Sequence, residues 1–190
     1  MEIKGYKGFF IDKKNQNGES FEIGKVYTVE EGEVFFGSLG HGFHFCKNLE
    51  DCFNYFNPSY SVYAEVTGLG DIKVKNDETT DSFGICVSSS IRIDNFLSRE
   101  EIVDMYLNPK KTLPYNSLMK FLKFFKLTEE EIEAFEEKYY QNYTFLETIL
   151  YYQRNQEDTY RDKLKTYSRI KDIQEKYRNK EEKKWYIQAF

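Results

Sequence analysis

Gly42-Phe43-His44-Phe45-Cys46 is the stretch that decides the fold of the first half of the chain. Phenylalanines alternate with less apolar residues, which is typical of a β-strand with one buried face. Successive side chains of a strand point to opposite faces, so Phe43 and Phe45 share one face while His44 and Cys46 share the other. The stretch therefore predicts a strand whose phenylalanines pack into a core.

Short apolar runs separated by glycine and polar residues surround this strand. They predict further strands at residues 5–11, 26–29, 34–36, 60–66, 71–75, 84–87 and 91–93. Gly68-Leu69-Gly70 is predicted to turn the chain between two of these strands. A short helix is predicted at residues 49–56, with Asn48 as its N-cap. Short strands joined by tight turns favour a mainly antiparallel sheet.

The hydrophobic period changes at Leu97 from that of a strand to that of a helix. Two capping boxes, Ser98 with Glu101 and Thr128 with Glu131, each predict the start of a helix. Helices are predicted at residues 99–107, 116–126, 129–153 and 160–187. The fold class is therefore α+β, with a β-rich domain at residues 1–96 and a helical bundle at residues 97–190.

Composition limits the class of protein. The 190 residues are 40% hydrophobic and 18% aromatic, enough for a packed core. No run approaches the roughly 18 apolar residues that span a bilayer, so we expect no membrane partner. The three cysteines, Cys46, Cys52 and Cys86, are odd in number and lack CxxC spacing. Free thiols and the lack of a secretory signal at the N-terminus predict a cytoplasmic location.

Charge is distributed unevenly along the chain. Residues 154–190 hold 11 Lys and Arg against 7 Asp and Glu, a balance of +4, which leaves 16 against 25, or −9, for residues 1–153. Aromatic residues are interleaved with the cations of this tail, and such a mixture suits a protein partner or a nucleic acid. The predicted partner-binding residues are Tyr160, Arg161, Tyr167, Arg169, Tyr177, Arg178 and Trp185. The long amphipathic helices are also compatible with a homodimer.

The spacing of the His and Cys residues gives little support to a metal site or to a cysteine nucleophile. His44 and Cys46, with Cys52 or His41, have the residue types of a zinc site, but no fourth ligand follows at a recognisable spacing. Cys46 beside a histidine has the residue types of a nucleophile, but no third group is evident to orient the base. We therefore predict no metal site and no resident catalytic set.

Residues 4–100 resemble a family of uncharacterised domains that is common in phage and prophage proteins. The blocks that carry the resemblance are Phe21-Glu22-Ile23-Gly24-Lys25-Val26-Tyr27 and Gly42-Phe43-His44-Phe45-Cys46. The resemblance implies no known activity but an origin in a mobile element. By analogy, it implies a protein that binds a host protein or ribonucleoprotein and inhibits a host defence system, such as a CRISPR nuclease.

The order of the strands and the short helix is also similar to that of ADP-ribosyltransferase folds. That resemblance implies an NAD pocket and a catalytic carboxylate, which would be Glu65, with His44 or Ser38 in the middle of the site. Tyr6 or Lys7 would lie at the first strand. The sequence thus leaves three hypotheses: an interaction module without cofactor, which we favour, an enzyme that uses NAD, and a nucleic-acid binder acting through the C-terminal helix.

Overall fold

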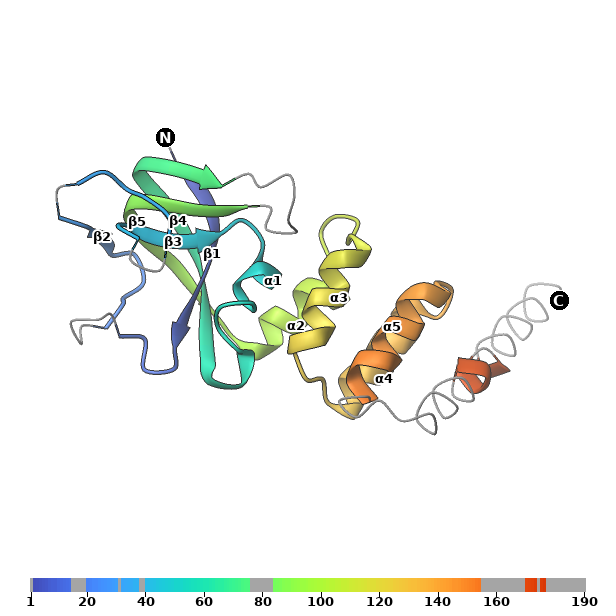
Figure 1. The fold of residues 1–190 in the computed structure, drawn as a ribbon. Helices are drawn as coiled ribbons and strands as arrows, with labels where there is room; N and C mark the ends of the chain where they lie inside the picture. Colours follow the sequence, from blue (N-terminus) through green and yellow to red (C-terminus); the bar gives the residue numbers. More distant parts are fainter. Residues whose placement is uncertain are drawn as a thin grey trace, which may run out of the picture. The chain divides into compact units, whose positions relative to one another are not determined.

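The computed structural model describes residues 2–14, 20–30, 32–37, 40–75, 84–154, 170–173 and 175–176. The fold is α+β, as predicted, with an antiparallel sheet followed by helices (Figure 1). The chain forms two compact units, Met1–Ile102 and Val103–Phe190, which we call the sheet unit and the helical unit. The division into functional domains at residues 96 and 97 stays a prediction.

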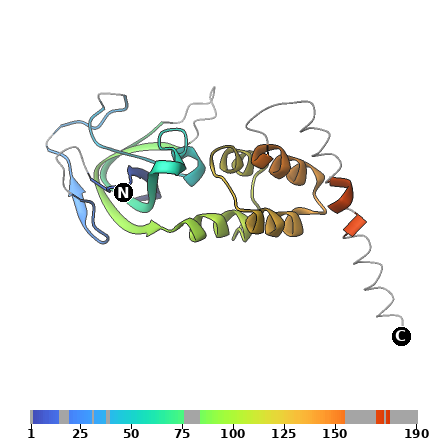
Figure 2. The same cartoon turned by 90° about the horizontal axis from the view of Figure 1, so that it is seen from below.

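The sheet unit contains five strands that curve round one another (Figures 1 and 2). They are β1 (Ile3–Phe10), β2 (Val26–Thr28), β3 (Phe43–Cys46), β4 (Ser61–Lys75) and β5 (Ile85–Leu97). The strand β5 pairs along one edge with β4, and along the other edge with β3 and then β2. Because β1 pairs with both β4 and β3, the four strands β1, β4, β5 and β3 form a closed ring.

The long strand β4 corrects the prediction of a turn at residues 68–70. The chain instead continues through this segment, with a shift of register between Leu69 and Ile72. Gly70 has φ of 75°, a left-handed conformation that glycine adopts without strain. The glycines thus mark an irregularity inside a strand, and irregularities of this kind bend strands and help sheets to close. Residues 85–87 and 91–93 likewise belong to the single strand β5, and Gly84 lies in the turn before it.

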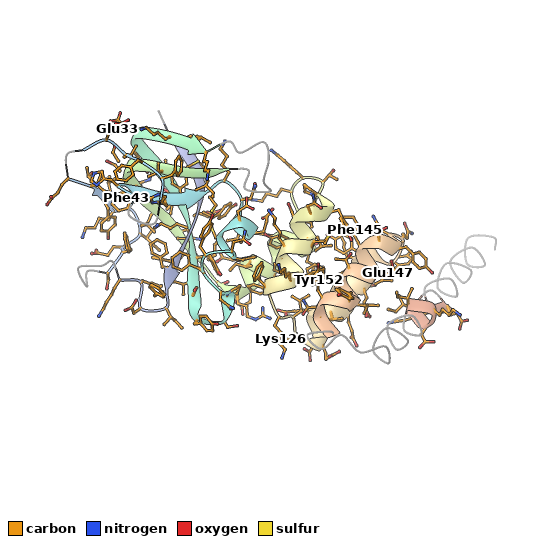
Figure 3. The ribbon with its side chains drawn as sticks, viewed as in Figure 1. Glu33, Phe43, Lys126, Phe145, Glu147 and Tyr152 are labelled. Carbon is orange, nitrogen blue, oxygen red and sulfur yellow. The ribbon has the colours of Figure 1, made fainter. Side chains whose placement is uncertain are left out.

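The core of the sheet unit follows the alternation in the sequence. Phe45 is fully buried in one cluster with Phe9, Val66 and Ile93, and Phe43 packs against this cluster (Figure 3). Fully burying one such side chain contributes roughly 1.5–3 kcal/mol. The alternating stretch therefore anchors the interior of the ring, as predicted.

Two predicted elements of the sheet unit are wrong. Residues 34–36 do not form a strand, although Val34 is buried and Phe35 N–H donates to the His41 carbonyl at 3.0 Å. The predicted helix at residues 49–56 is only the short α1 (Leu49–Cys52), followed by the 3₁₀ turn η1 (Pro58–Tyr60). Asn48 is the N-cap residue of α1, but its side chain accepts no capping hydrogen bond, and its amide group donates to the Asp51 carboxylate.

The helical unit is built from four described helices, the first of which begins in the sheet unit. They are α2 (Arg99–Leu107), α3 (Tyr115–Phe124), α4 (Glu129–Tyr139) and α5 (Tyr143–Arg154). Both predicted capping boxes are confirmed. The predicted single helix at residues 129–153 is wrong, because the chain breaks at residues 140–142. There the Asn142 side chain accepts a hydrogen bond from Phe145 N–H and starts α5, which is a role that asparagine favours.

Aromatic rings fill the helical unit. Phe121 of α3 stacks on Tyr106 at 4.0 Å between ring centroids and lies 6.1 Å from Phe135 of α4. Phe145 of α5, labelled in Figure 3, stacks on Tyr139. Figure 2 shows α3, α4 and α5 alongside one another. These contacts form a core of large planar side chains.

Part of the predicted last helix lies within the described residues. Residues 170–173 and 175–176 are helical, and Ile170 and Ile173 pack against Leu146 and Leu150 of α5. The rest of the predicted helix at residues 160–187 lies outside the described residues. Among the helices of the described part of the chain, none is both long enough and apolar enough to cross a membrane.

Candidate functional site

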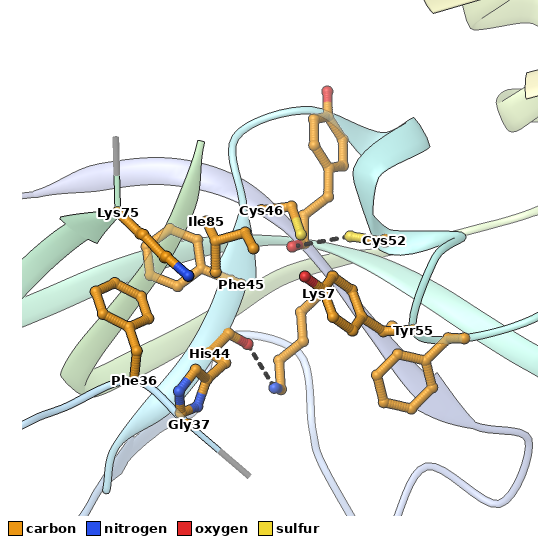
Figure 4. A pocket seen from close by; sticks show the side chains of 13 residues that line it. Lys7, Phe36, Gly37, His44, Phe45, Cys46, Cys52, Tyr55, Lys75 and Ile85 are labelled. Atoms are coloured by element: carbon orange, nitrogen blue, oxygen red, sulfur yellow. Dashed lines mark hydrogen bonds between the residues drawn. The ribbon is translucent and has the colours of Figure 1, made fainter. Parts of the chain in front are cut away.

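Strands β1 and β3 meet at a single residue pair, Tyr6 opposite Cys46, whereas β1 and β4 pair along the whole of β1. Beyond this pair the two strands no longer share ladder positions. A cavity of about 480 Å³ opens at this point, lined by Lys7 and Gly8 of β1 and by His44 of β3 (Figure 4). We call this place the seam and the hollow the seam cavity.

The seam cavity combines aromatic walls with basic and thiol groups. Its lining residues are Tyr6, Lys7, Gly8, Phe36, Gly37, His44, Phe45, Cys46, Cys52, Tyr55, Phe56, Lys75 and Ile85. No aspartate or glutamate is among these lining residues. A site of this composition suits an anion with a planar or apolar body.

Lys7 is the most unusual of the lining residues. It lies on the same strand face as Phe9 and opposite Ala64, so its side chain starts from the core face of β1. The residue keeps some exposure, but its Nζ is enclosed and donates a hydrogen bond of 2.6 Å to the His44 carbonyl oxygen (Figure 4). Burial lowers the pKa of Lys7, and the neighbouring thiols of Cys52 and Cys46 offset this only in part.

His44 lies beside Lys7 and is held in its neutral form. Burial and then the positive charge of Lys7 lower the pKa of His44, and a hydrogen bond to the backbone of Gly42 acts in the opposite direction. The Nε2 atom is buried and has no hydrogen-bond partner among the described residues. A buried polar atom without a partner costs free energy unless a ligand or water satisfies it. Nε2 therefore has a hydrogen-bonding capacity that no described residue satisfies.

The Cys52 thiol at the seam is protonated at neutral pH. Cys52 Sγ donates to the Tyr6 carbonyl oxygen at 3.3 Å (Figure 4). A hydrogen bond to Cys46 and then burial raise the pKa of Cys52. Since the thiolate is the nucleophilic form, this environment does not activate Cys52. Within the described residues, no group of three or more His, Cys, Asp or Glu side chains is arranged to hold a metal ion.

Only part of the predicted enzyme site comes together. His44 and Lys7 both line the seam cavity. Glu65 does not: it is exposed on β4, opposite Tyr6, so that β1 separates it from β3. Tyr6 has a raised pKa, first through burial and then through the charge of Glu65. Ser38 lies outside the described residues.

The predicted partner-binding residues cannot be placed in the same way. Tyr160, Arg161, Tyr167, Arg169, Tyr177, Arg178 and Trp185 all lie outside the described residues. Their role stays a prediction.

Several lining residues were not predicted as site residues from the sequence, and Phe36, Tyr55 and Lys75 are examples. They come from a loop, from the turn after α1 and from the end of β4, and no local pattern joins them. Lys7 did leave a signal, because a lysine two positions before Phe9 shares its strand face with a core residue. A charge on a core face is rarely buried without a partner and so marks a candidate site.

Comparison with known families now places the domain. Residues 3–105 match the model of a domain of unknown function, DUF7666. The chain belongs to this family. The DUF7666 match contains all five strands and every residue that lines the seam cavity. Searches of curated proteins and of solved structures found no match.

Proposed function

We propose that the DUF7666 domain binds a small anionic molecule with a planar, apolar body in the seam cavity. The observation that carries this proposal is the lining itself, with two lysines and a neutral histidine among aromatic rings, and without a carboxylate side chain.

The charge of the site supports an anion. Lys7 makes no ion pair with a carboxylate among the described residues, and its enclosed ammonium group is bound to a neutral carbonyl. An enclosed charge without a counter-ion is costly, so an anionic ligand gains by supplying one. Lys75 lies exposed at the rim of the same cavity, where it attracts an approaching anion.

The walls of the cavity support a planar body. Four of the residues that line the hollow are aromatic: Phe36, Phe45, Tyr55 and Phe56. Aromatic rings favour offset or edge-on contacts with a flat ligand. A donor group on the ligand, such as a hydroxyl or an amide N–H, would satisfy the open Nε2 of His44.

Matched pairs of charged and uncharged probes test this proposal. We expect adenosine 5′-monophosphate and 4-carboxybenzyl alcohol to bind more tightly in calorimetry than adenosine and benzyl alcohol. In Lys7→Met and Lys75→Gln the preference should fall by about ten- to a hundredfold, the range for losing a charged hydrogen bond. Lys4→Met and Lys73→Gln are matched controls, since these lysines lie on the same strands outside the cavity. Equal binding of charged and uncharged probes would contradict the proposal.

A second proposal concerns a protein partner. We propose that a host protein or ribonucleoprotein docks on the chain, as the sequence suggests. One observation favours it: Phe10, Ile11, Tyr55 and Tyr60 are large apolar side chains that are each more than 60% exposed. Phe10 pairs with Ser61, the residue that follows Tyr60 in the sequence, and the Phe10 ring contacts the Phe56 ring. We call these four residues the rim patch; exposed aromatic side chains of this kind are typical anchors of interfaces.

Capture of partners by the full chain tests the second proposal. Phe10→Ser with Ile11→Ser should reduce the yield of a specific partner, and so should truncation at about Leu107 if the tail carries the predicted anchors. If both variants retained the partner, the second proposal would be wrong. Inhibition of a host defence system, a phage origin and a homodimer are narrower hypotheses that rest on the sequence alone. The free state of Cys46, Cys52 and Cys86 supports a cytoplasmic location.

The other two hypotheses have direct tests. For an ADP-ribosyltransferase-like enzyme, NAD at a hundred times a typical Kd should stabilise the fold by about 2.7 kcal/mol. If NAD gave no stabilisation, the hypothesis of an NAD-dependent enzyme would be wrong. For a nucleic-acid binder, affinity should fall steeply with salt.

A further inference from the structure

The position of Lys7 in the seam cavity suggests more than charge recognition. Its amine lies within a hollow of about 480 Å³ and is fixed by one hydrogen bond to the His44 carbonyl oxygen. A carbonyl oxygen only accepts, so this bond holds the amine in place without competing for its nitrogen lone pair once a proton is lost. An acidic partner, which would keep the amine protonated, is absent from the cavity lining.

These features are the ones that favour amine nucleophiles. Lysine reacts with carbonyl compounds as the neutral amine, and apolar surroundings or a nearby positive charge favour that form. The first is present here, because the Lys7 amine is buried, with the Phe9 ring centroid 5.7 Å from Nζ. Lys75 supplies a positive charge elsewhere on the lining of the same cavity. Lys75 itself is exposed at the end of β4 and lacks such an enclosure.

We propose that Lys7 forms an imine with an anionic aldehyde or ketone bound in the seam cavity. This inference rests on the proposed function and names the class of ligand more closely. The negative charge of the ligand lies toward Lys75, its flat body lies among the aromatic rings, and its carbonyl carbon faces Lys7 Nζ.

The step is a condensation without oxidation or reduction. The lone pair of the neutral amine attacks the carbonyl carbon and forms a C–N bond, while the carbonyl oxygen takes up a proton. The resulting carbinolamine loses its oxygen as water, and the two protons of that water balance the two that leave the nitrogen. A C=N bond remains, and water reverses the step.

Reductive trapping on the intact chain tests the proposal. The protein is incubated with 4-carboxybenzaldehyde and sodium cyanoborohydride, which converts an imine into a stable secondary amine, and the labelled lysines are located by peptide mapping. We expect Lys7 to be labelled faster than Lys4, Lys73 or Lys75, by about tenfold for each unit by which its pKa is lowered. Excess 4-carboxybenzyl alcohol, which has the same charge and ring but lacks the carbonyl, should slow the labelling of Lys7 alone.

The outcomes separate the two proposals. If 4-carboxybenzyl alcohol binds and Lys7 is labelled no faster than the exposed lysines, the imine proposal is wrong and the anion site stands. If the alcohol does not bind and Lys7 shows no preference, both proposals fail. Because the measurement is made on the natural sequence, it does not depend on how well a variant folds. Lys7→Arg, which keeps a donor, should lose only the label at position 7.

Discussion

The helical unit fills its interior with stacked rings, whereas the sheet unit leaves a hollow whose lining includes two lysines, a histidine and two thiols. Phe121 and Phe135 are fully buried in the helical unit and stack in layers. In the sheet unit, Lys7 and His44 occupy space between strands that apolar side chains would fill more favourably. The difference is the one expected if the helical interior is packed for stability and the seam, as proposed, gives up some packing to form a binding site.

The largest effect is expected where the helical unit is packed most tightly. Phe121→Ala removes a ring that contacts Tyr106, Phe125 and Phe135. We expect a loss of about 3–5 kcal/mol in the free energy of unfolding, measured with urea. Phe124→Ala on the same helix is a control, since Phe124 is only partly buried and should cost less. If the two variants lost the same free energy of unfolding, the ring contacts of Phe121 would contribute no more to stability than those of a partly buried residue.

A smaller effect is expected at the closest approach of strands in the sheet unit. A Cβ on Gly5 would lie 2.3 Å from the Cys46 carbonyl oxygen, which is too close for any side chain. Gly5→Ala should therefore push β3 away from β1 and cost roughly 1–3 kcal/mol. Hydrogen exchange should rise in β1 and β3 but not in α3–α5. Unchanged exchange in β3 would mean that the ring does not depend on this contact.

The buried amine predicts a pH dependence that the helical core lacks. The pKa of Lys7 is lowered in the folded protein from 10.5, so between the two values the unfolded chain binds more protons. The free energy of unfolding should therefore rise with pH in this window relative to Lys7→Met, by about 1.4 kcal/mol for each unit of the shift. Unfolding measured from pH 7 to pH 10.5 checks this, with Lys4→Met as control. Parallel curves for wild type and Lys7→Met would contradict the burial.

A smaller loss in the free energy of unfolding is expected when the capping box at the start of α4 is removed. The Thr128 hydroxyl accepts from Glu131 N–H, and the Glu131 side chain accepts from Thr128 N–H. Thr128→Ala should cost about 1 kcal/mol. Thr144→Ala, an exposed position near the start of α5, should cost less. An equal cost at both sites would mean that the capping box adds nothing to the helical unit.

The smallest effect on stability is expected at the rim patch. Phe10 is 69% exposed, so Phe10→Ser should change the free energy of unfolding by only about 0.5 kcal/mol. If the change were several times larger, Phe10 would belong to the core rather than to a docking surface.

Local signals in the sequence predicted the fold where they carry a complete physical reason. The alternation at residues 42–46 and the two capping boxes each specify both geometry and hydrogen bonding. The predictions failed where one residue type has two uses. Gly68 and Gly70 are compatible with a turn and with an irregular strand. The pairing of β4 with β5 on both sides of them keeps the chain in a strand. Asn142 suits a helix surface as well as a helix start, and its side chain was found at a helix start.

The candidate site was harder to predict from the sequence than the fold. His44 and Cys46 stood out because the alternation places them on one strand face, and Lys7 was noted only through a family resemblance. Phe36 and Lys75 come from separate segments, and only the closing of the ring brings them to one hollow. Sequence periodicity reports which face a residue occupies, but not which distant strands leave a gap between them.

The single residue pair at the seam also bears on self-association. Where β1 and β3 part, each has an edge that is not covered by the other, and uncovered strand edges recruit strands from neighbouring molecules. Inward-pointing charged residues at a strand edge are one of the features that discourage an incoming strand. We therefore expect a chain that lacks the charge of Lys7 to form oligomers at lower concentration than the natural sequence.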